Sequence, residues 1–389
     1  MTRLKRRKIM GITKAVALIV VPFAIAVTAK EIPEMKKAVD RMNSIELNKE
    51  TEKDKDIVEQ PYYSEHTERE YKDFLSGEIF LSEGYGTSEE KVEKGSKVKL
   101  LSPLEMTSEN AGDKPYPTEW NPDCTIIRTT YGNYSGTSFF DLEKAGQVNN
   151  KTDISNDTLY SESMYLPSFT VENTSEPQVL IYHTHTTESF EPYVRDFYDS
   201  SFNYRTTDET KNVVMVGDAI QAELEARGIG VIHDTTVHDY PSYNGSYERS
   251  RETVMSILEQ NPSIKVVLDI HRDAISGEGE AYQPYVEIDG KEAAQIMIIS
   301  GCDDGTMDMP NYMKNFHFAC CLQQKLESDF SGLTRPILFD YRHYNQDLTT
   351  GSLLIEVGSH GNTLEQVQYS GQLIGRSLGD LMNYLKKYS

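Results

Sequence analysis

The chain has 389 residues, and 39 Lys and Arg against 61 Asp and Glu give a formal net charge of −22. This length suits one or two domains. The acidic balance argues against a nucleic-acid-binding protein, which needs basic surface. A hydrophobic content of 38% excludes a multi-span membrane protein. The charge is uneven, because residues 1–14 hold six basic and no acidic side chains. The two ends of the chain therefore meet different environments.

An apolar segment follows this basic start. Ala15–Ala29 holds no charged residue, and with the residues before it approaches the roughly 20 that span a bilayer. Basic residues ahead of such a segment place the N-terminus in the cytoplasm and the following chain outside. We expect residues 1–9 to be a cytoplasmic tail and residues 10–29 a single transmembrane anchor. A cleaved signal peptide is the alternative, because small residues lie near the end of the segment.

The next part of the chain is polar. Residues 30–115 are rich in Glu, Lys, Asp and Ser, and such a composition buries too little apolar surface to offset its ordering entropy. We expect a flexible spacer there, with a small accessory domain around Tyr71–Phe80 as the alternative. Residues 116–389 should then form the folded domain, with a core over about 145–389.

Strand and helix patterns alternate through this domain. The expected strands are Gln178–Tyr182, Gly230–His233, Ile264–Ile270, Gln295–Ser300 and Ser352–Gly358. The expected helices carry apolar stripes over Val213–Leu224, Val254–Leu258, Met313–Cys320 and Leu364–Leu385, the last capped by Asn362. This order predicts an α/β fold with a mostly parallel, twisted sheet flanked by helices. The four cysteines do not resemble a disulfide framework. Cys320 and Cys321 are adjacent in a helix, so we expect at most one to face the core.

Three of the strands carry chemical groups at or near their C-terminal ends, where sites form in α/β sheets. The first runs into His183–Glu188, the second into His271, Arg272 and Asp273, and the third contains Glu356. Imidazoles and carboxylates at one edge of a sheet suit a catalytic zinc, which takes three protein ligands and leaves one position for water. Glu356 lies within an apolar strand, where a carboxylate is costly unless it is paired or functional.

Two neighbouring histidines compete for one role. His183 and His185 are two residues apart, so they share a face if the strand continues that far. Both could then point to a metal ion, although only one need bind it.

Four segments resemble the stage II sporulation protein P family of peptidoglycan amidases, which is related to the zinc-dependent N-acetylmuramoyl-L-alanine amidases. The segments are PQVLIYHTHTTESF, HDYPSYNGSYERS, IKVVLDIHRDA and YNQDLTTGSLLIEVGSHGNTLEQ, and they occur in the family's order. The similarity covers roughly residues 145–389, and an N-terminal anchor with a variable spacer also fits this family.

The resemblance implies an amidase-like fold and a set of site residues. It implies Zn²⁺ held by His185, Glu188 and His271, with Glu356 as the catalytic base. Glu209 is the alternative middle ligand. The resemblance favours Glu188, which lies in the HTHTTES motif itself, and its i, i+3 spacing from His185 lets both reach one metal if the turn is helical. The resemblance leaves His183, Arg272 and Asp273 with supporting roles near the ligands, and Arg272 could bind a carboxylate of the stem peptide.

The implied reaction is hydrolysis of the amide between N-acetylmuramic acid and L-Ala of the stem peptide, during engulfment in sporulation. Action on stem-peptide cross-links is a further implication, and a zinc peptidase of the wall is a related alternative. A different class is a non-catalytic scaffold of a wall-remodelling complex. The implied partners are glycan strands, stem peptides and membrane-bound engulfment proteins, including a stage II sporulation protein D-like transglycosylase, with no nucleic acid. The catalytic domain would be extracytoplasmic.

Overall fold

The computed structural model describes residues 113–386. The predicted cytoplasmic tail and anchor, and all of the spacer up to residue 112, lie outside the described residues. No helix within 113–386 combines the length and the apolarity needed to cross a bilayer. The predictions on the membrane anchor therefore stay predictions.

The main sheet has eight strands in the order β2-β3-β12-β11-β13-β7-β4-β6. In that order the strands are β2 (Phe139–Asp141), β3 (Gln147–Asn150), β12 (Ile337–Tyr341), β11 (Ile296–Cys302), β13 (Ser352–Ser359), β7 (Val266–Asp273), β4 (Pro177–Tyr182) and β6 (Gly230–His233). Neighbours run parallel except β2 with β3 and β11 with β13. The predicted α/β fold with a mostly parallel sheet therefore holds for this sheet. The antiparallel pairing places the start of β11 at the edge where β7 and β13 end.

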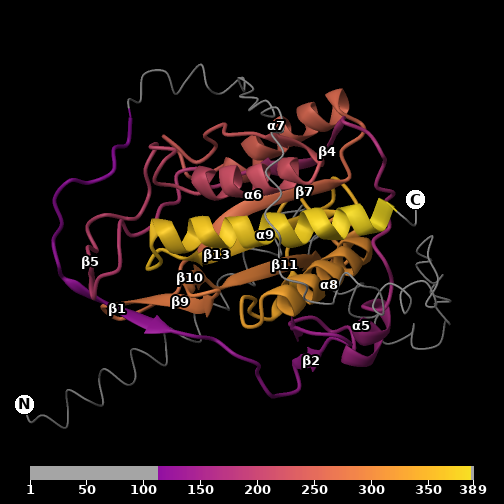
Figure 1. Cartoon of the computed structure of the whole chain (residues 1–389), viewed down its shortest axis with the longest axis horizontal. Coiled ribbons are helices and arrows are strands. Elements are labelled where there is room, and N and C mark those ends of the chain that lie inside the picture. The colour runs from indigo at the N-terminus through magenta and orange to yellow at the C-terminus, as the bar shows by residue number, and fades with distance from the viewer. Residues whose placement is uncertain (1–112, 387–389) are drawn as a thin grey trace, which may run out of the picture. The chain divides into compact units, whose positions relative to one another are not determined.

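Helices cover both faces of this sheet. On one face lie α6 (Val214–Ala226), α8 (Tyr312–Asp329) and α9 (Leu364–Leu385), and α9 runs between the other two (Figure 1). The opposite face is covered by α7 (Ser246–Gln260). Strand β4 shows the division, since Val179 and Ile181 belong to the first core and Leu180 and Tyr182 to the second. Because β4 is buried on both faces, nearly all of its residues are apolar, and this continuous apolar run is the pattern from which the strand was predicted.

Helix α9 has a different start from the expected one. Thr363, and not Asn362, is the N-cap, and with Gln366 it forms a capping box. Gly371, Gly375 and Gly379 recur every fourth residue along α9. A Cβ at Gly375 would lie 2.7 Å from Ile220 O of α6, and one at Gly371 would lie 2.9 Å from Val216 O. The glycines therefore let α6 and α9 pack backbone to backbone.

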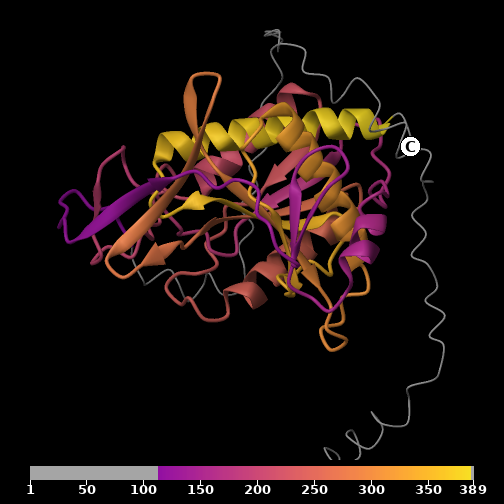
Figure 2. The same cartoon turned by 90° about the horizontal axis from the view of Figure 1, so that it is seen from below.

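A second, five-stranded sheet was not predicted. Its path is β10-β9-β1-β5, and β8 also pairs with β9. The strands are β1 (Cys124–Thr129), β5 (Phe197–Tyr198), β8 (Ser276–Gly277), β9 (Glu280–Ile288) and β10 (Lys291–Ala294). The long β9–β10 hairpin projects beside the end of α9 in the view from below (Figure 2). Its turn is Asp289-Gly290, and both residues have positive φ, as hairpin turns of this composition require.

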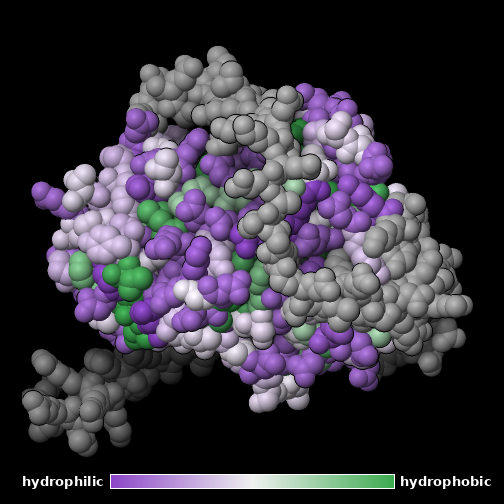
Figure 3. Space-filling model, in the orientation of Figure 1, coloured by the Kyte–Doolittle hydropathy of each residue, from purple (hydrophilic) through white to green (hydrophobic). Residues whose placement is uncertain are grey.

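The prediction for the paired cysteines was wrong. Cys320 and Cys321 are both fully buried, because α8 is covered by the sheet on one side and by α9 and α5 (Asn156–Glu162) on others. All four cysteines, each within the described residues, are free thiols. The surface drawn in Figure 3 is mostly hydrophilic with small, separate apolar areas, as suits a strongly acidic chain.

Candidate functional site

The segment after β4 forms a tight turn. Strand β4 ends at Tyr182, so it does not continue far enough for His183 and His185 to share a strand face. The amide of Glu188 donates to His185 O over 3.0 Å, which is the i, i+3 bond of a helical turn. This turn brings the side chains of His185 and Glu188 to the same side, as the preferred ligand pair requires.

Two neighbouring strands supply the other two site residues. Strand β7 continues to Asp273, further than the predicted Ile270, so His271 lies within the strand. Its direct register partner on β13 is Glu356. Paired residues of neighbouring strands project to the same face. The turn after β4 therefore meets His271 and Glu356 at one edge of the sheet.

Glu188 lies beside His271 and is held by two arginines. Its Oε2 is 3.6 Å from Nδ1 of His271 and accepts from the backbone amide of Arg272 over 3.1 Å. Its Oε1 accepts from Nη2 of Arg205 over 3.1 Å. Burial alone would raise the pKa of Glu188, but His271 and the two arginine charges outweigh it and hold the pKa well below its usual value. Glu188 is therefore an ionised acceptor.

The two histidine rings meet edge to face. The centroids of His185 and His271 are 5.2 Å apart, with an interplanar angle of 80°. His185 Nδ1 lies 3.3 Å from Ser246 Oγ, which leaves Nε2 for a ligand. Burial, followed by the neighbouring His271, lowers the pKa of His185 to about 4. His185 is therefore neutral near pH 7, as a metal ligand must be.

Asp269 lies on the side of the His271 ring that faces away from Glu188. Its Oδ1 lies 2.8 Å from Nε2 of His271, although Nε2 forms no hydrogen bond of good geometry. With Asp269 behind Nε2, Nδ1 is the nitrogen that faces Glu188. Ligand histidines of metal sites commonly present one nitrogen to the ion and the other to a carboxylate.

The donor set suits zinc chemically. Two ligands at zinc's usual distances of about 2.0–2.1 Å lie roughly 3.3 Å apart in a tetrahedron, close to the 3.6 Å between Glu188 Oε2 and His271 Nδ1. Within residues 113–386, however, no three His, Cys, Asp or Glu side chains already converge on a single point. Two of the donors are thus spaced for one ion, and the ring of His185 lies beside that of His271, with centroids 5.2 Å apart.

Glu356 differs from Glu188 in its surroundings. Its Oε2 is buried and has no hydrogen-bond partner. Burial, followed by the charge of Asp273, raises the pKa of Glu356 to about 8. A carboxylate with a pKa near neutrality, free of internal partners, is suited to accepting and returning a proton.

His183 does not join the cluster. Its Nδ1 donates to Ile270 O over 2.9 Å, and its Nε2 is 2.8 Å from Nε2 of His233. His233 Nδ1 in turn lies 3.1 Å from Asp218. Both nitrogens of His183 are engaged inside the protein, so between the two histidines the geometry favours His185 as the ligand.

Arg272 and Asp273 also have structural partners. The guanidinium of Arg272 donates to Ser189 O and Tyr204 O over 2.9 and 3.0 Å and is buried. It is therefore not placed to bind a carboxylate of a substrate. Asp273 accepts from Arg335 Nη1 over 2.9 Å. Glu209 lies on a turn ahead of α6, and no hydrogen bond or ion pair joins it to His185 or His271.

Several site residues were missed by the sequence analysis. Asp269 had a signal, because it is a charged residue inside an apolar strand, as Glu356 is. Arg205 had none: it links Glu188 to Asp239, and Asp239 accepts from the amide and hydroxyl of Thr187. Such a bridge depends on three loops meeting in space.

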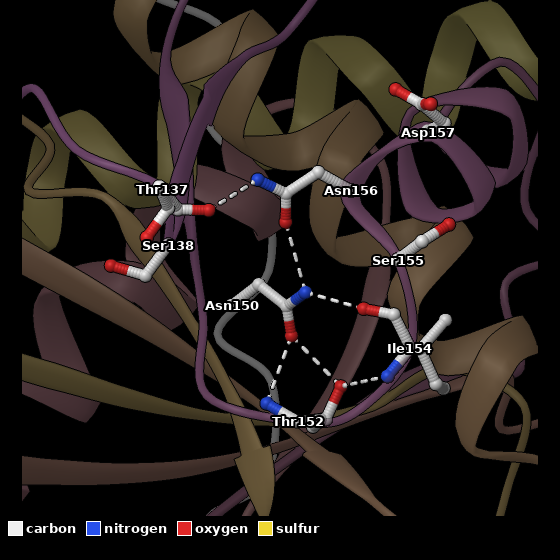
Figure 4. A pocket seen from close by; sticks show the side chains of 8 residues that line it. All are labelled: Thr137, Ser138, Asn150, Thr152, Ile154, Ser155, Asn156 and Asp157. Carbon is white, nitrogen blue, oxygen red and sulfur yellow. Dashed lines mark hydrogen bonds between the residues drawn. The ribbon is translucent and has the colours of Figure 1, made fainter.

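A hollow elsewhere on the surface has a different character (Figure 4). It is lined by Thr137, Ser138, Asn150, Thr152, Ile154, Ser155, Asn156 and Asp157. The side-chain NH2 group of Asn150 donates to Ile154 O and to Asn156 Oδ1. Its side-chain oxygen accepts from the backbone amide and the hydroxyl of Thr152. These groups satisfy one another and hold the loop ahead of α5, and none of the predicted site residues lines the hollow.

The fold and the site define an α/β protein with a buried histidine–carboxylate cluster at the C-terminal ends of neighbouring parallel strands. The chain belongs to the stage II sporulation protein P (SpoIIP) family, whose model matches residues 26–379. It is 31% identical over 201 residues to the stage II sporulation protein P of Bacillus subtilis (strain 168), which is 49% of this chain and 47% of that protein. The chain thus spans about half the length of the curated relative that it matches.

Several solved amidase structures are weakly similar to this chain. The N-acetylmuramoyl-L-alanine amidase AmiC2 of Nostoc punctiforme aligns with 54% of this chain and 97% of its own, at 12% identity and a TM-score of 0.33. The CwlD amidase of Clostridioides difficile, in complex with the GerS lipoprotein, aligns with 55% and 100%, at 14% identity and a TM-score of 0.33. These are likenesses only, and the site's chemistry is argued from its own residues.

Proposed function

We propose that this protein is a zinc-dependent peptidoglycan amidase that hydrolyses the amide between N-acetylmuramic acid and L-Ala of the stem peptide. The observation that carries the proposal is the pairing of His271 with Glu356 across neighbouring strands, with Glu188 Oε2 3.6 Å from His271 Nδ1. Membership of the SpoIIP family supports a role in the cell wall during sporulation.

The proposed roles follow from the surroundings of each residue. His185, Glu188 and His271 would hold the ion, which when bound polarises a carbonyl and lowers the pKa of water. Arg205 and the amide of Arg272 orient the carboxylate of Glu188. Asp269 fixes the ring of His271 from behind.

Glu356 would carry the proton. Its Oε2 has no partner inside the protein, so it is available to accept a proton from the attacking water. The same carboxyl would then return that proton to the leaving amine of L-Ala. Because Glu356 is the direct neighbour of His271, the base would lie next to the carbonyl that His271 helps to position.

The wider biological setting is part of the proposal. We infer a single-pass anchor at residues 10–29, which places the domain outside the cytoplasm, and a spacer that lets it reach the wall. Membrane-bound engulfment proteins, including a stage II sporulation protein D-like transglycosylase, would be its partners. Action on stem-peptide cross-links remains a further proposal on the same site.

Product analysis tests the proposed reaction. Purified sacculi would be digested with the full-length protein, and the released fragments identified by mass spectrometry. Free stem peptides that begin with L-Ala are expected, and Glu356→Gln and His271→Ala should abolish them while leaving circular dichroism unchanged. Release of peptides cut only inside the stem would contradict the amidase assignment. Full activity after exhaustive chelation would contradict the zinc assignment.

A further inference from the structure

The loop between β6 and α7 is held rigidly against the site. Arg249, on the first turns of α7, donates to three backbone carbonyls of this loop: His238 O over 2.6 Å, Asn244 O over 3.1 Å and Ser242 O over 2.5 Å. One guanidinium thus ties both ends and the middle of residues 238–244 to the helix. A side chain carried by this loop is therefore presented in a fixed position.

That side chain is Tyr243. Its ring stacks on His185, with centroids 4.6 Å apart and an interplanar angle of 17°, and Arg205 Cζ lies 4.9 Å from the ring centroid. Even so, 53% of Tyr243 is exposed. A large aromatic ring is thus fixed directly on a proposed metal ligand, with more than half of its surface open to solvent.

The other tyrosines near the site are already partnered. Tyr247 stacks on Tyr344 at 5.3 Å and lies nearly parallel to His271, at 6.5 Å and 12°. Neither Tyr247 nor Tyr344 is among the strongly exposed aromatic side chains of the described residues. Of these three tyrosines beside the ligands, Tyr243 is the most exposed.

The covalent structure of the proposed substrate places a sugar close to this ring. In muramic acid, three bonds separate ring carbon C3 from the carbonyl carbon of the scissile amide: C3–O, O–CH and CH–C. At about 1.5 Å a bond, C3 lies within roughly 4 Å of the reacting carbon. When the carbonyl of the scissile amide lies at the proposed metal ligands His185 and His271, the pyranose ring is therefore close to the side chains that contact these two histidines.

We propose that Tyr243 is a specificity-determining residue that stacks on the muramic acid ring and so selects glycan-bound stem peptides over free ones. The inference rests on the proposed function for the identity of the sugar. An aromatic face and the C–H face of a pyranose make an uncharged contact that a protein of net charge −22 can offer to an anionic wall without electrostatic attraction.

The test compares two substrates that share the scissile amide. One is a disaccharide–peptide that contains muramic acid, and the other is the same peptide carrying only a D-lactoyl group. For the full-length protein, Tyr243→Leu should lower kcat/KM on the disaccharide–peptide about 10-fold, through KM, while Tyr243→Phe stays within about 2-fold. Neither variant should change kcat/KM on the lactoyl peptide. The matched control is Tyr160→Leu, since Tyr160 is 38% exposed on α5, near the opposite edge of the sheet, and it should leave both substrates unaffected.

Direct binding separates this proposal from the proposed reaction. The full-length Glu356→Gln protein would be titrated with a peptide-free glycan tetrasaccharide by calorimetry, with and without Tyr243→Leu. Weaker binding in the double variant supports the stacking role, even if the wild-type protein cleaves neither substrate and the amidase assignment fails. An equal loss of activity on both substrates would mean that Tyr243 acts through His185 and would overturn the proposal. Unchanged kinetics and unchanged glycan binding would also overturn it.

Discussion

Replacing Glu356 by Gln should stabilise the metal-free protein at alkaline pH. Burial raises the pKa of Glu356 from 4.5 to about 8, so between these pH values the folded protein keeps a proton that the unfolded chain has lost. Stability therefore falls as pH rises through this window and stays low above it. At about 1.4 kcal/mol per pKa unit, the full penalty is about 5 kcal/mol, of which about 4 kcal/mol accrues between pH 5 and pH 9. Gln has the same shape and does not titrate.

The measurement is urea unfolding of the full-length, chelator-treated protein at pH 5 and pH 9. The advantage of Glu356→Gln over the wild type should grow by about 4 kcal/mol between the two pH values. The control is Glu259→Gln, the same carboxyl-to-amide change on the exposed end of α7, and the gain of Glu356→Gln is measured relative to it. A difference for Glu356→Gln that is the same at both pH values would refute the argument that Glu356 is kept neutral by burial.

Two further predictions concern Asp269, which lies beside the proposed ligand His271, and the packing of α6 against α9. Asp269→Asn should weaken zinc binding about 10- to 100-fold, because Asn cannot act as a charged partner of His271; competition with a chromogenic chelator measures this, and unchanged affinity would remove Asp269 from the site. Gly375→Ala should cost about 1–3 kcal/mol in urea unfolding, because its Cβ would lie 2.7 Å from Ile220 O. Gly132→Ala is its control, since a Cβ there meets nothing within 4 Å, and equal stabilities of the two variants would show that α6 and α9 separate without cost.

The central part of the fold could be predicted because its strands are buried on both faces. Such strands are continuous apolar runs, and β4 and β13 were found within about one residue of their observed ends. The second sheet was missed because β9 has no regular alternation, contains Pro284 and takes its parallel partner, β1, from more than 150 positions earlier. The Asp289-Gly290 turn was the local signal that could have found the hairpin.

The candidate site was predictable in composition and less so in detail. His271 and Glu356 stand out as polar residues in apolar strands, and the structure places them side by side. The spacing of His183 and His185 alone could not rank them, because the difference depends on β4 ending at Tyr182; only the family resemblance favoured His185. Nor could it show that the guanidinium of Arg272 is taken by backbone carbonyls, since Ser189 and Tyr204 lie far from it along the chain.

The buried contact between His183 and His233 has a consequence for the tautomers of the two rings. A carbonyl only accepts, so His183 must donate Nδ1–H to Ile270 O. Burial lowers the pKa of His183 to about 3, so the ring is neutral and its Nε2 accepts from His233 Nε2–H. His233 Nδ1 in turn lies 3.1 Å from Asp218, a carboxylate that is partly exposed to solvent. The contacts beneath the loop of His185 and Glu188 therefore run in one direction, from His233 through His183 to the backbone of β7, and fix the tautomer of His183.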